Sequence, residues 1–449
     1  METKKKGFPV AFWVCACSEI FERLAYYLGR SLILIFVTAS VATGGLGLSD
    51  TVAANMQSNL TAFSYLLPLF GAVIVDKYIG ARYTTPVGMF IAAAGYFTGG
   101  IAKSAIGVYV MIFLVSLGLA LFKNGAIIGR VITDKSQMDP AFSMRYTLVN
   151  VGAFIGTFLV GILYKDVFAK DGVLGFAPCF KMAALMMVLG GLWYIFVCWR
   201  FLGDLGKLPF KKTLTEEEKA AEAKKKEETG TKQPLTTIEK KRIGAIFVAS
   251  LFSIVFWIFW YLGYMPVYFY WAENMDWVVA GYQVPSTWFD AANSLFCVIL
   301  GPVTAALWKK LAARPQGDMS LFRKTGLGIA IIGVGYLFYA AIDIMRGGEK
   351  ASVLWLIVFA FLLTMGEMFF SPLGHSFISK YSPSRYLAVM MSVWGFATFI
   401  AAKSYGPVYG LLFGGKIEFK VACIGVAVVS FAAALIMIAL DKKLSALVD

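Results

Sequence analysis

Charged residues are scarce in this chain of 449 residues, where they make up 15% of the sequence while hydrophobic residues make up 59%. The mean hydropathy of +0.71 lies well above the range of soluble domains. This composition excludes a water-soluble globular protein and predicts a polytopic membrane protein. The formal net charge of +14 then reflects topology and attraction to anionic lipid, and we do not expect nucleic-acid binding.

Residues that carry enzymatic chemistry are also few. There is one histidine, His375, and the sequence has no HExxH or GxSxG motif, so neither a metal-dependent nor a serine hydrolase is indicated. The six cysteines form no CxxC pair and are interpreted as apolar filler. GLLFGGKI at 410–417 fits GxxxxGK, but Ile417 stands where an ATP-binding loop needs Ser or Thr. We expect no enzyme, no metal and no cofactor, and the role of His375 stays open between a proton relay and a structural hydrogen bond.

Long apolar runs dominate what is present. Each is long enough to cross about 30 Å of hydrocarbon as a helix. The predicted transmembrane helices are 8–39, 51–75, 83–102, 105–132, 141–164, 178–200, 243–271, 287–308, 323–345, 352–380, 384–412 and 417–440. The fold class is therefore all-α, integral to the membrane, with twelve transmembrane helices. An N-terminal secretory signal is the alternative for the first run, but Glu19 stands where cleavage needs small residues.

Lysine and arginine in the connecting loops predict the orientation, because basic loops stay on the cytoplasmic side. With the N-terminus inside, that side collects about twice as many of these residues as the other side, which places both termini in the cytoplasm. The segment 201–242 is rich in Lys, Glu and Thr and is predicted to be a charged cytoplasmic linker. It separates an N-terminal bundle, 1–200, from a C-terminal bundle, 243–449. Two six-helix halves are typical of the major facilitator fold, in which the halves move about a midplane site.

The first predicted helix contains SEIFERLAYYLGR, residues 18–30, with four charges inside an apolar run. At about 100° per residue, the charges and Tyr26 form one stripe roughly 100° wide, with Tyr27 beside it. Charges facing lipid would cost several kcal/mol each, so this stripe is predicted to face the protein interior. Glu22 is expected to pair with Arg23 or Arg30.

Two more charges lie near the middle of predicted helices: Lys123 in 105–132 and Glu367 in 352–380. One falls in each half, which predicts an anion receptor of Lys123, Arg23 and Arg30 and a cation receptor at Glu367. A ligand that fits both is a zwitterion. Structural ion pairs are the alternative. Asp290 is interpreted as a helix cap or rim residue, and Gly125xxxGly129 and Gly152xxxGly156 as helix-packing pairs.

These residues also carry a family resemblance. Glu19-x-x-Glu22-Arg23-x-x-Tyr26-Tyr27 resembles the ExxERFxYY motif of the proton-dependent oligopeptide transporters, the POT or PTR branch of the major facilitator superfamily. The resemblance continues through YLLPLFGAVIVDKYIGAR (65–82), Lys123, RYTLVNVGAFIG (145–156), WFDAANSLFCVILGPVTAALW (288–308), LLTMGEMFFSPLG (362–374) and MMSVWGF (390–396).

The resemblance implies proton-coupled import of di- and tripeptides across the cell membrane, driven by the proton gradient, by a monomer. It assigns the peptide carboxylate to Arg23, Arg30 and Lys123, and the peptide amino terminus to Glu367 and Asn293. The remaining substrate contacts are assigned to Tyr26, Tyr27, Tyr65, Asn150 and Trp394. Proton coupling is assigned to Glu19, Glu22, Arg23, Lys123 and Glu367.

The sequence departs from the family pattern at three points. Asn124 replaces a proline, Arg145 replaces a phenylalanine, and an aromatic residue in FWIFWYLGY replaces a glutamine. A proton-coupled transporter of another solute, such as nitrate, an organic acid or a modified amino acid, and a peptide sensor therefore stay as alternatives. Trp257, Trp260, Tyr261 and Tyr264 could select bulky side chains, with half or more of these rings expected to face lipid or the interface.

Overall fold

The computed structural model describes residues 7–132, 138–209, 235–315, 319–383 and 386–448. The chain divides into two compact units. Unit 1 comprises residues 1–48 and 66–215, and unit 2 comprises 49–65 and 216–449. The long helix α2 (Asp50–Lys77) therefore contributes its first half to unit 2 and its second half to unit 1. Of the predicted linker 201–242, residues 210–234 lie outside the described residues.

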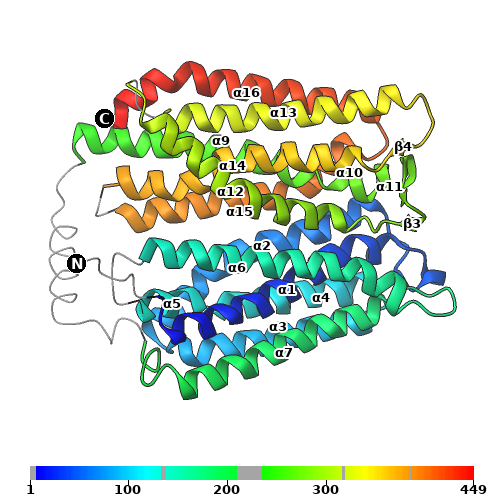
Figure 1. Ribbon diagram of the computed structural model, residues 1–449, viewed down its shortest axis with the longest axis horizontal. Coiled ribbons are helices and arrows are strands. Elements are labelled where there is room, and N and C mark those ends of the chain that lie inside the picture. The colour runs from blue at the N-terminus through cyan, green and yellow to red at the C-terminus, as the bar shows by residue number, and fades with distance from the viewer. Residues whose placement is uncertain (1–6, 133–137, 210–234, 316–318, 384–385, 449) are drawn as a thin grey trace. The chain divides into compact units, whose positions relative to one another are not determined.

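Unit 1 is a helical bundle (Figure 1). Besides its part of α2, it contains α1 (Val10–Thr38), η1 (Val41–Thr43), α3 (Ala81–Ile101), α4 (Ala105–Leu121), α5 (Asn124–Val131), α6 (Met138–Ile162), the π-helix η3 (Leu163–Val167) and α7 (Phe176–Arg200). In this unit α1 packs on α6 and α7, and α3 packs on α4 and α7.

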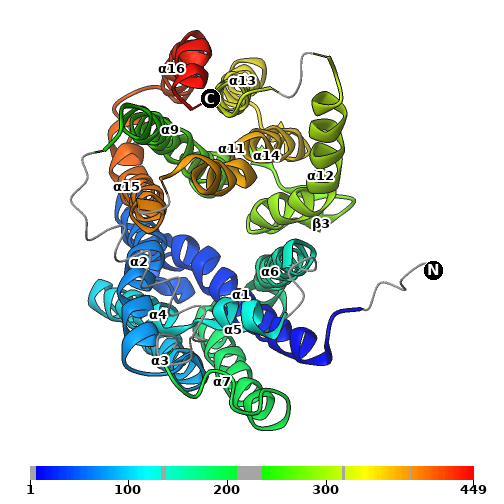
Figure 2. The same cartoon turned by 90° about the vertical axis from the view of Figure 1, so that its left-hand side faces the viewer.

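Unit 2 is a second helical bundle, with α13 beside α16 when its helices are viewed end-on (Figure 2). Its helices are α9 (Thr237–Leu262), α10 (Met265–Tyr268), α11 (Tyr270–Asn274), α12 (Trp288–Ala312), α13 (Leu321–Met345), α14 (Trp355–Tyr381), α15 (Leu387–Leu412) and α16 (Phe419–Val448). Two short sheets lie in its loops: β1 (Met275–Asp276) pairs in parallel with β4 (Ala351–Ser352), and β2 (Val278–Val279) pairs antiparallel with β3 (Tyr282–Gln283).

The predicted helices and the observed ones agree closely. In the described residues, twelve helices of 17 to 30 residues coincide with the twelve apolar runs, and their ends differ from the predicted ends by a few residues in most cases. Seven of the described helices are both long and apolar enough to cross a membrane. The all-α membrane fold is thus confirmed, while the count of twelve spans and the cytoplasmic termini stay predictions.

The run 105–132 is the exception, because it is two helices. Helix α4 ends at Leu121 and α5 begins at Asn124, with Lys123 in a non-helical conformation between them. The prediction that Lys123 lies inside one continuous helix is therefore wrong. At the break, the backbone N–H of Lys123 donates to Thr85 Oγ1 of α3 at 3.2 Å, so a side chain takes the place of a helical acceptor.

Small residues determine how closely α6 approaches α1. A side chain at Gly152 would place its Cβ 2.9 Å from the carbonyl oxygen of Ile20, and one at Gly156 would place it 2.5 Å from that of Leu24. The two glycines lie one turn apart on α6 and contact successive turns of α1. The packing interpretation of Gly152xxxGly156 is confirmed, and this contact fixes the height of the charged stripe against α6.

The loop between α2 and α3 is tied to the end of α7. Arg82 donates its Nη1 to the carbonyl oxygen of Gly203, and its backbone N–H donates to Gly206 at 3.1 Å. The side chain of Asp76, near the end of α2, lies outside the described residues, as does that of His375 in α14.

Candidate functional site

The charged stripe of α1 faces the interior of unit 1, as predicted. Glu19 and Glu22 are 2% and 1% exposed, and Tyr26 and Arg30 are also buried. Arg23 is half-buried. Carboxylates this deeply buried require partners, because an isolated ionised group in an apolar interior is far less stable than one in water.

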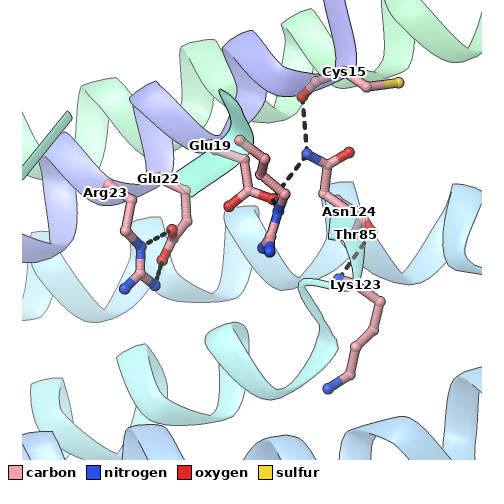
Figure 3. A network of polar contacts seen from close by, with 8 residues as sticks. Cys15, Glu19, Glu22, Arg23, Thr85, Lys123 and Asn124 are labelled. Carbon is pink, nitrogen blue, oxygen red and sulfur yellow. Dashed lines mark hydrogen bonds and ion pairs between the residues drawn. The ribbon is translucent and has the colours of Figure 1, made fainter. Parts of the chain in front are cut away.

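Glu22 forms an ion pair with the adjacent residue, Arg23. The guanidinium of Arg23 grips the carboxylate with two nitrogens: Nη2 donates to Oε1 at 2.6 Å, and Nε pairs with Oε2 (Figure 3). The predicted pairing of Glu22 is confirmed for Arg23. The same guanidinium lies 5.0 Å from the ring centre of Tyr26, and that of Arg30 lies 5.7 Å from the ring of Tyr27. Tyr26 and Tyr27 therefore make cation–π contacts with Arg23 and Arg30, respectively.

Glu19 pairs with Arg145 and Asn124, two of the residues at which the sequence departs from the family pattern. Arg145 Nε of α6 donates to Glu19 Oε1 at 2.9 Å, and Asn124 Nδ2 of α5 donates to the same oxygen at 3.1 Å. Asn124 Nδ2 also donates to the carbonyl oxygen of Cys15 at 2.8 Å (Figure 3). The available signal was charge balance: Glu22 has Arg23 beside it, whereas Glu19 has no adjacent base, and Arg145 is an unexpected base in an apolar run.

The other predicted cation of unit 1, Lys123, lies at the α4–α5 break. Its Nζ donates to the carbonyl oxygen of Pro68 in α2 at 2.8 Å. Lys123 is thus held on two sides: its N–H donates to a side-chain hydroxyl of α3, and its ammonium group donates to a backbone carbonyl of α2.

Asn150 and Tyr65 occupy different surroundings from the α1 stripe. Asn150 Nδ2 donates to the carbonyl oxygen of Tyr146 one turn earlier on α6. Tyr65 belongs to the part of α2 in unit 2, where it accepts a hydrogen bond from Tyr261 at 3.2 Å between the hydroxyl oxygens. Both side chains are at least partly exposed, which leaves their polar atoms reachable by a ligand.

Glu367 of α14 lies at the centre of a polar cluster in unit 2. It is 8% exposed. Asn293 of α12 donates from Nδ2 to Glu367 Oε2 at 3.2 Å and to Thr364 Oγ1 at 2.9 Å, and the thiol of Cys297 lies 3.8 Å from the same Oε2. The structure thus brings the two predicted amine ligands, Glu367 and Asn293, into direct contact.

Two further members of this cluster, Thr364 and Cys297, were not predicted from the sequence, although helical spacing could have indicated them. Thr364 lies one turn before Glu367, and Cys297 lies one turn after Asn293, so each shares a helix face with a predicted ligand. The interpretation of Cys297 as simple apolar filler is therefore wrong, because its thiol hydrogen-bonds to a carboxylate.

Two further expectations about unit 2 are corrected. Asp290 lies in the first turn of α12, but it is 5% exposed and accepts a hydrogen bond from Tyr268 at 3.1 Å, so it is not a rim residue. Trp260, Tyr261 and Tyr264 are buried, so most of this aromatic group faces the interior of the unit instead of lipid. Periodicity could not show this, because α9 from Ile243 onward has apolar residues on every face.

Trp394 of α15 completes the set of predicted residues. It is buried, and its ring centre lies 5.4 Å from that of Phe370 on α14. Unit 1 therefore carries the basic and acidic residues of α1 with Lys123 and Asn150, while unit 2 carries Glu367, Asn293, Tyr65 and Trp394.

Comparisons with known proteins bear on this arrangement. A sequence model of the POT family matches residues 204–413. The chain is 25% identical to the uncharacterized transporter YclF of Bacillus subtilis, over 89% of this chain and 87% of that protein. It is 24% identical to the peptide transporter YePEPT of Yersinia enterocolitica, over 92% of this chain and 88% of that protein.

Solved structures of POT family transporters have a similar fold. A POT family transporter in complex with 5-aminolevulinic acid superimposes with a TM-score of 0.85 at 24% identity, covering 98% of each chain. Matches along nearly the full length in sequence and in fold agree with the motif resemblance of α1, α2, α6, α12 and α14. The chain therefore resembles the POT family in sequence and in fold along nearly its full length, and it is a multi-pass membrane protein.

Proposed function

We propose that this protein imports di- and tripeptides together with protons, by alternating access and without a cofactor, using the proton gradient as its energy source. The observation that carries the proposal is the separation of charge between the two units. Unit 1 holds a cluster of bases on and beside α1, and unit 2 holds a buried carboxylate, Glu367, with an amide beside it. A peptide is a zwitterion whose two termini match these two receptors.

The roles of the residues follow from their chemistry. Arg23, Arg30 and Lys123 can donate to the peptide carboxylate, since guanidinium and ammonium groups form the strongest hydrogen bonds with anions. Glu367 can accept from the peptide ammonium group, and Asn293, which now donates to Glu367, keeps its carboxylate oriented. Tyr26, Tyr65 and Asn150 offer hydroxyl and amide groups to the peptide backbone.

Coupling to protons would come from exchange of partners. Arg23 now serves as the partner of Glu22. When a peptide carboxylate draws Arg23 away, Glu22 is left buried without a counter-charge, and a proton relieves this cost. A ligand can shift the conformational equilibrium only through such differences in contact between states.

The test is uptake of labelled dialanine into proteoliposomes with an imposed inward proton gradient, with and without excess unlabelled tripeptide. Accumulation that depends on the gradient and is competed by the tripeptide supports the proposal. Uptake of nitrate, an organic acid or a modified amino acid in place of dialanine would replace peptides by another solute. Saturable binding of dialanine to purified protein without any uptake would identify a sensor.

A further inference from the structure

The carboxylate of Glu19 is held by groups from two helices other than its own. Arg145 on α6 donates to Oε1 at 2.9 Å, and Asn124 on α5 donates to the same atom at 3.1 Å. Asn124 and Arg145 stand 105 and 126 positions away in the chain. Three helices of unit 1 therefore meet at one buried oxygen atom (Figure 3).

The surroundings of Arg145 are shaped to admit its guanidinium. Gly125 follows Asn124, and a Cβ at this position would lie 3.1 Å from both Cζ and Nη2 of Arg145. Any larger residue would press against the guanidinium. The Asn-Gly pair at the start of α5 thus supplies a donor for Glu19 and the space for its counter-charge. The same amide is anchored to α1 through the carbonyl oxygen of Cys15.

The two acids of α1 have separate guanidinium partners. Glu22 is gripped by Arg23 on its own helix, and Glu19 by Arg145 from α6. The Glu22–Arg23 pair lies within α1, so a movement between helices does not separate its members. The Glu19–Arg145 pair links α1 to α6. Opening the second pair requires α1 and α6 to separate or Arg145 to swing away.

The different exposure of the two side chains makes the opening of the Glu19–Arg145 pair depend on the charge of Glu19. The side chain of Arg145 is 31% exposed, so its guanidinium can turn to water at small cost, whereas Glu19 is 2% exposed and cannot. An ionised Glu19 left behind would be a buried charge with only an amide for support, which is strongly unfavourable. Release of Arg145 is therefore favourable only when Glu19 takes up a proton.

We propose that Arg145, with Asn124 as the second donor, is the positioning residue of Glu19, and that a proton reaching this carboxylate releases Arg145 and loosens the contact of α1 with α6. The carboxylate of Glu19 becomes a carboxylic acid, and no other covalent bond changes. This inference rests on the proposed proton-coupled transport. The titratable groups Cys15, Glu22 and Tyr194 interact electrostatically with Glu19, and Glu22 also interacts with Arg145.

The first experiment separates coupling from structure. Arg145→Gln, Arg145→Lys and the wild type are compared in two assays with labelled dialanine: accumulation driven by a proton gradient, and counterflow without a gradient. We expect Arg145→Gln to lose at least about tenfold in accumulation with counterflow largely retained, because the buried carboxylate loses its counter-charge. Arg145→Lys should restore most of the accumulation. Equal loss in both assays, or no loss, would overturn the coupling role.

A matched control tests whether any Arg–carboxylate pair would behave in this way. Arg323 of α13 pairs with Asp441 of α16 at 2.8 Å in unit 2. Arg323→Gln should leave the ratio of accumulation to counterflow at the wild-type value. A ratio lowered as far as in Arg145→Gln would show that loss of an ion pair anywhere disturbs coupling, and would overturn the specific role of Arg145.

The second experiment does not depend on the substrate. Thermal unfolding in detergent is measured for Glu19→Gln, Arg145→Gln and the double variant. A direct pair predicts that the double variant loses less than the sum of the single losses, because the second substitution removes a partner that is already gone. Additive losses would overturn the pairing. If the wild type accumulates no dialanine, the proposed function and the coupling step fail together, and the unfolding cycle still decides whether Arg145 positions Glu19.

Discussion

Replacing Glu367 by glutamine isolates the charge that we assign to the amino terminus of the substrate. The substitution keeps the size of the side chain and one acceptor oxygen, so Asn293 can still donate as it now does at 3.2 Å. What it removes is the negative charge in a site where Glu367 is 8% exposed. A peptide ammonium group would then donate to a neutral amide oxygen in place of a carboxylate, and the attraction between opposite charges would be lost.

The expected loss follows from the strength of such bonds. Hydrogen bonds that involve charged groups contribute about 1.5 to 3 kcal/mol each. At about 1.36 kcal/mol for each factor of ten, this corresponds to roughly a 10- to 160-fold weaker affinity for dialanine. N-acetyl-dialanine has no ammonium group, so its affinity should change by less than about threefold.

The assay is competition of each unlabelled ligand with labelled dialanine for binding to the purified protein. Glu349→Gln serves as the matched control, because Glu349 is an exposed glutamate in the loop after α13. If Glu367→Gln weakens the binding of both ligands equally, the amine contact is refuted, since the carboxylate would then support the fold and not bind the amine. An unchanged affinity for dialanine would refute it as well.

Three further predictions concern transport and stability. Glu22→Gln should abolish proton-driven accumulation of dialanine and spare counterflow, because glutamine keeps the shape but cannot carry a proton; full accumulation would contradict this role. Gly156→Ala places a methyl group 2.5 Å from the Leu24 carbonyl oxygen, so the free energy of unfolding in detergent should fall by about 1 to 3 kcal/mol. Gly425→Ala, with open space around it, should show no such loss. Thr236→Ala removes the capping box of α9 and should weaken that helix end by about 1 kcal/mol, measured by amide hydrogen exchange.

Hydropathy was sufficient to locate the long helices, because each one is selected by its own apolar length. The run 105–132 shows the limit of this signal. Its composition is continuous, yet the chain breaks at Lys123, where Thr85 from another helix supplies the hydrogen bond. A break stabilised by a residue 38 positions away leaves no trace in a local average.

The buried face of α1 was also predictable, whereas the partners of its charges were only partly so. The 3.6-residue period places Glu19, Glu22 and Arg23 on one face, and the cost of charge in lipid decides that this face points inward. Adjacency suggested that Glu22 pairs with Arg23. Nothing in the local sequence could pair Glu19 with Arg145, because that contact depends on how α6 is rotated and shifted along α1.

The sequence by itself determined the class of this protein: its apolar helices, its two candidate receptors of opposite charge and its resemblance to the POT family. The tertiary structure alone decided which group faces which: Arg145 and Asn124 on Glu19, Cys297 and Asn293 on Glu367, and the buried position of Asp290. The physical reason is that burial and periodicity are properties of one segment, whereas a hydrogen bond between helices needs the rotation and height of both, which here are fixed by close contacts such as those of Gly152 and Gly156 with α1.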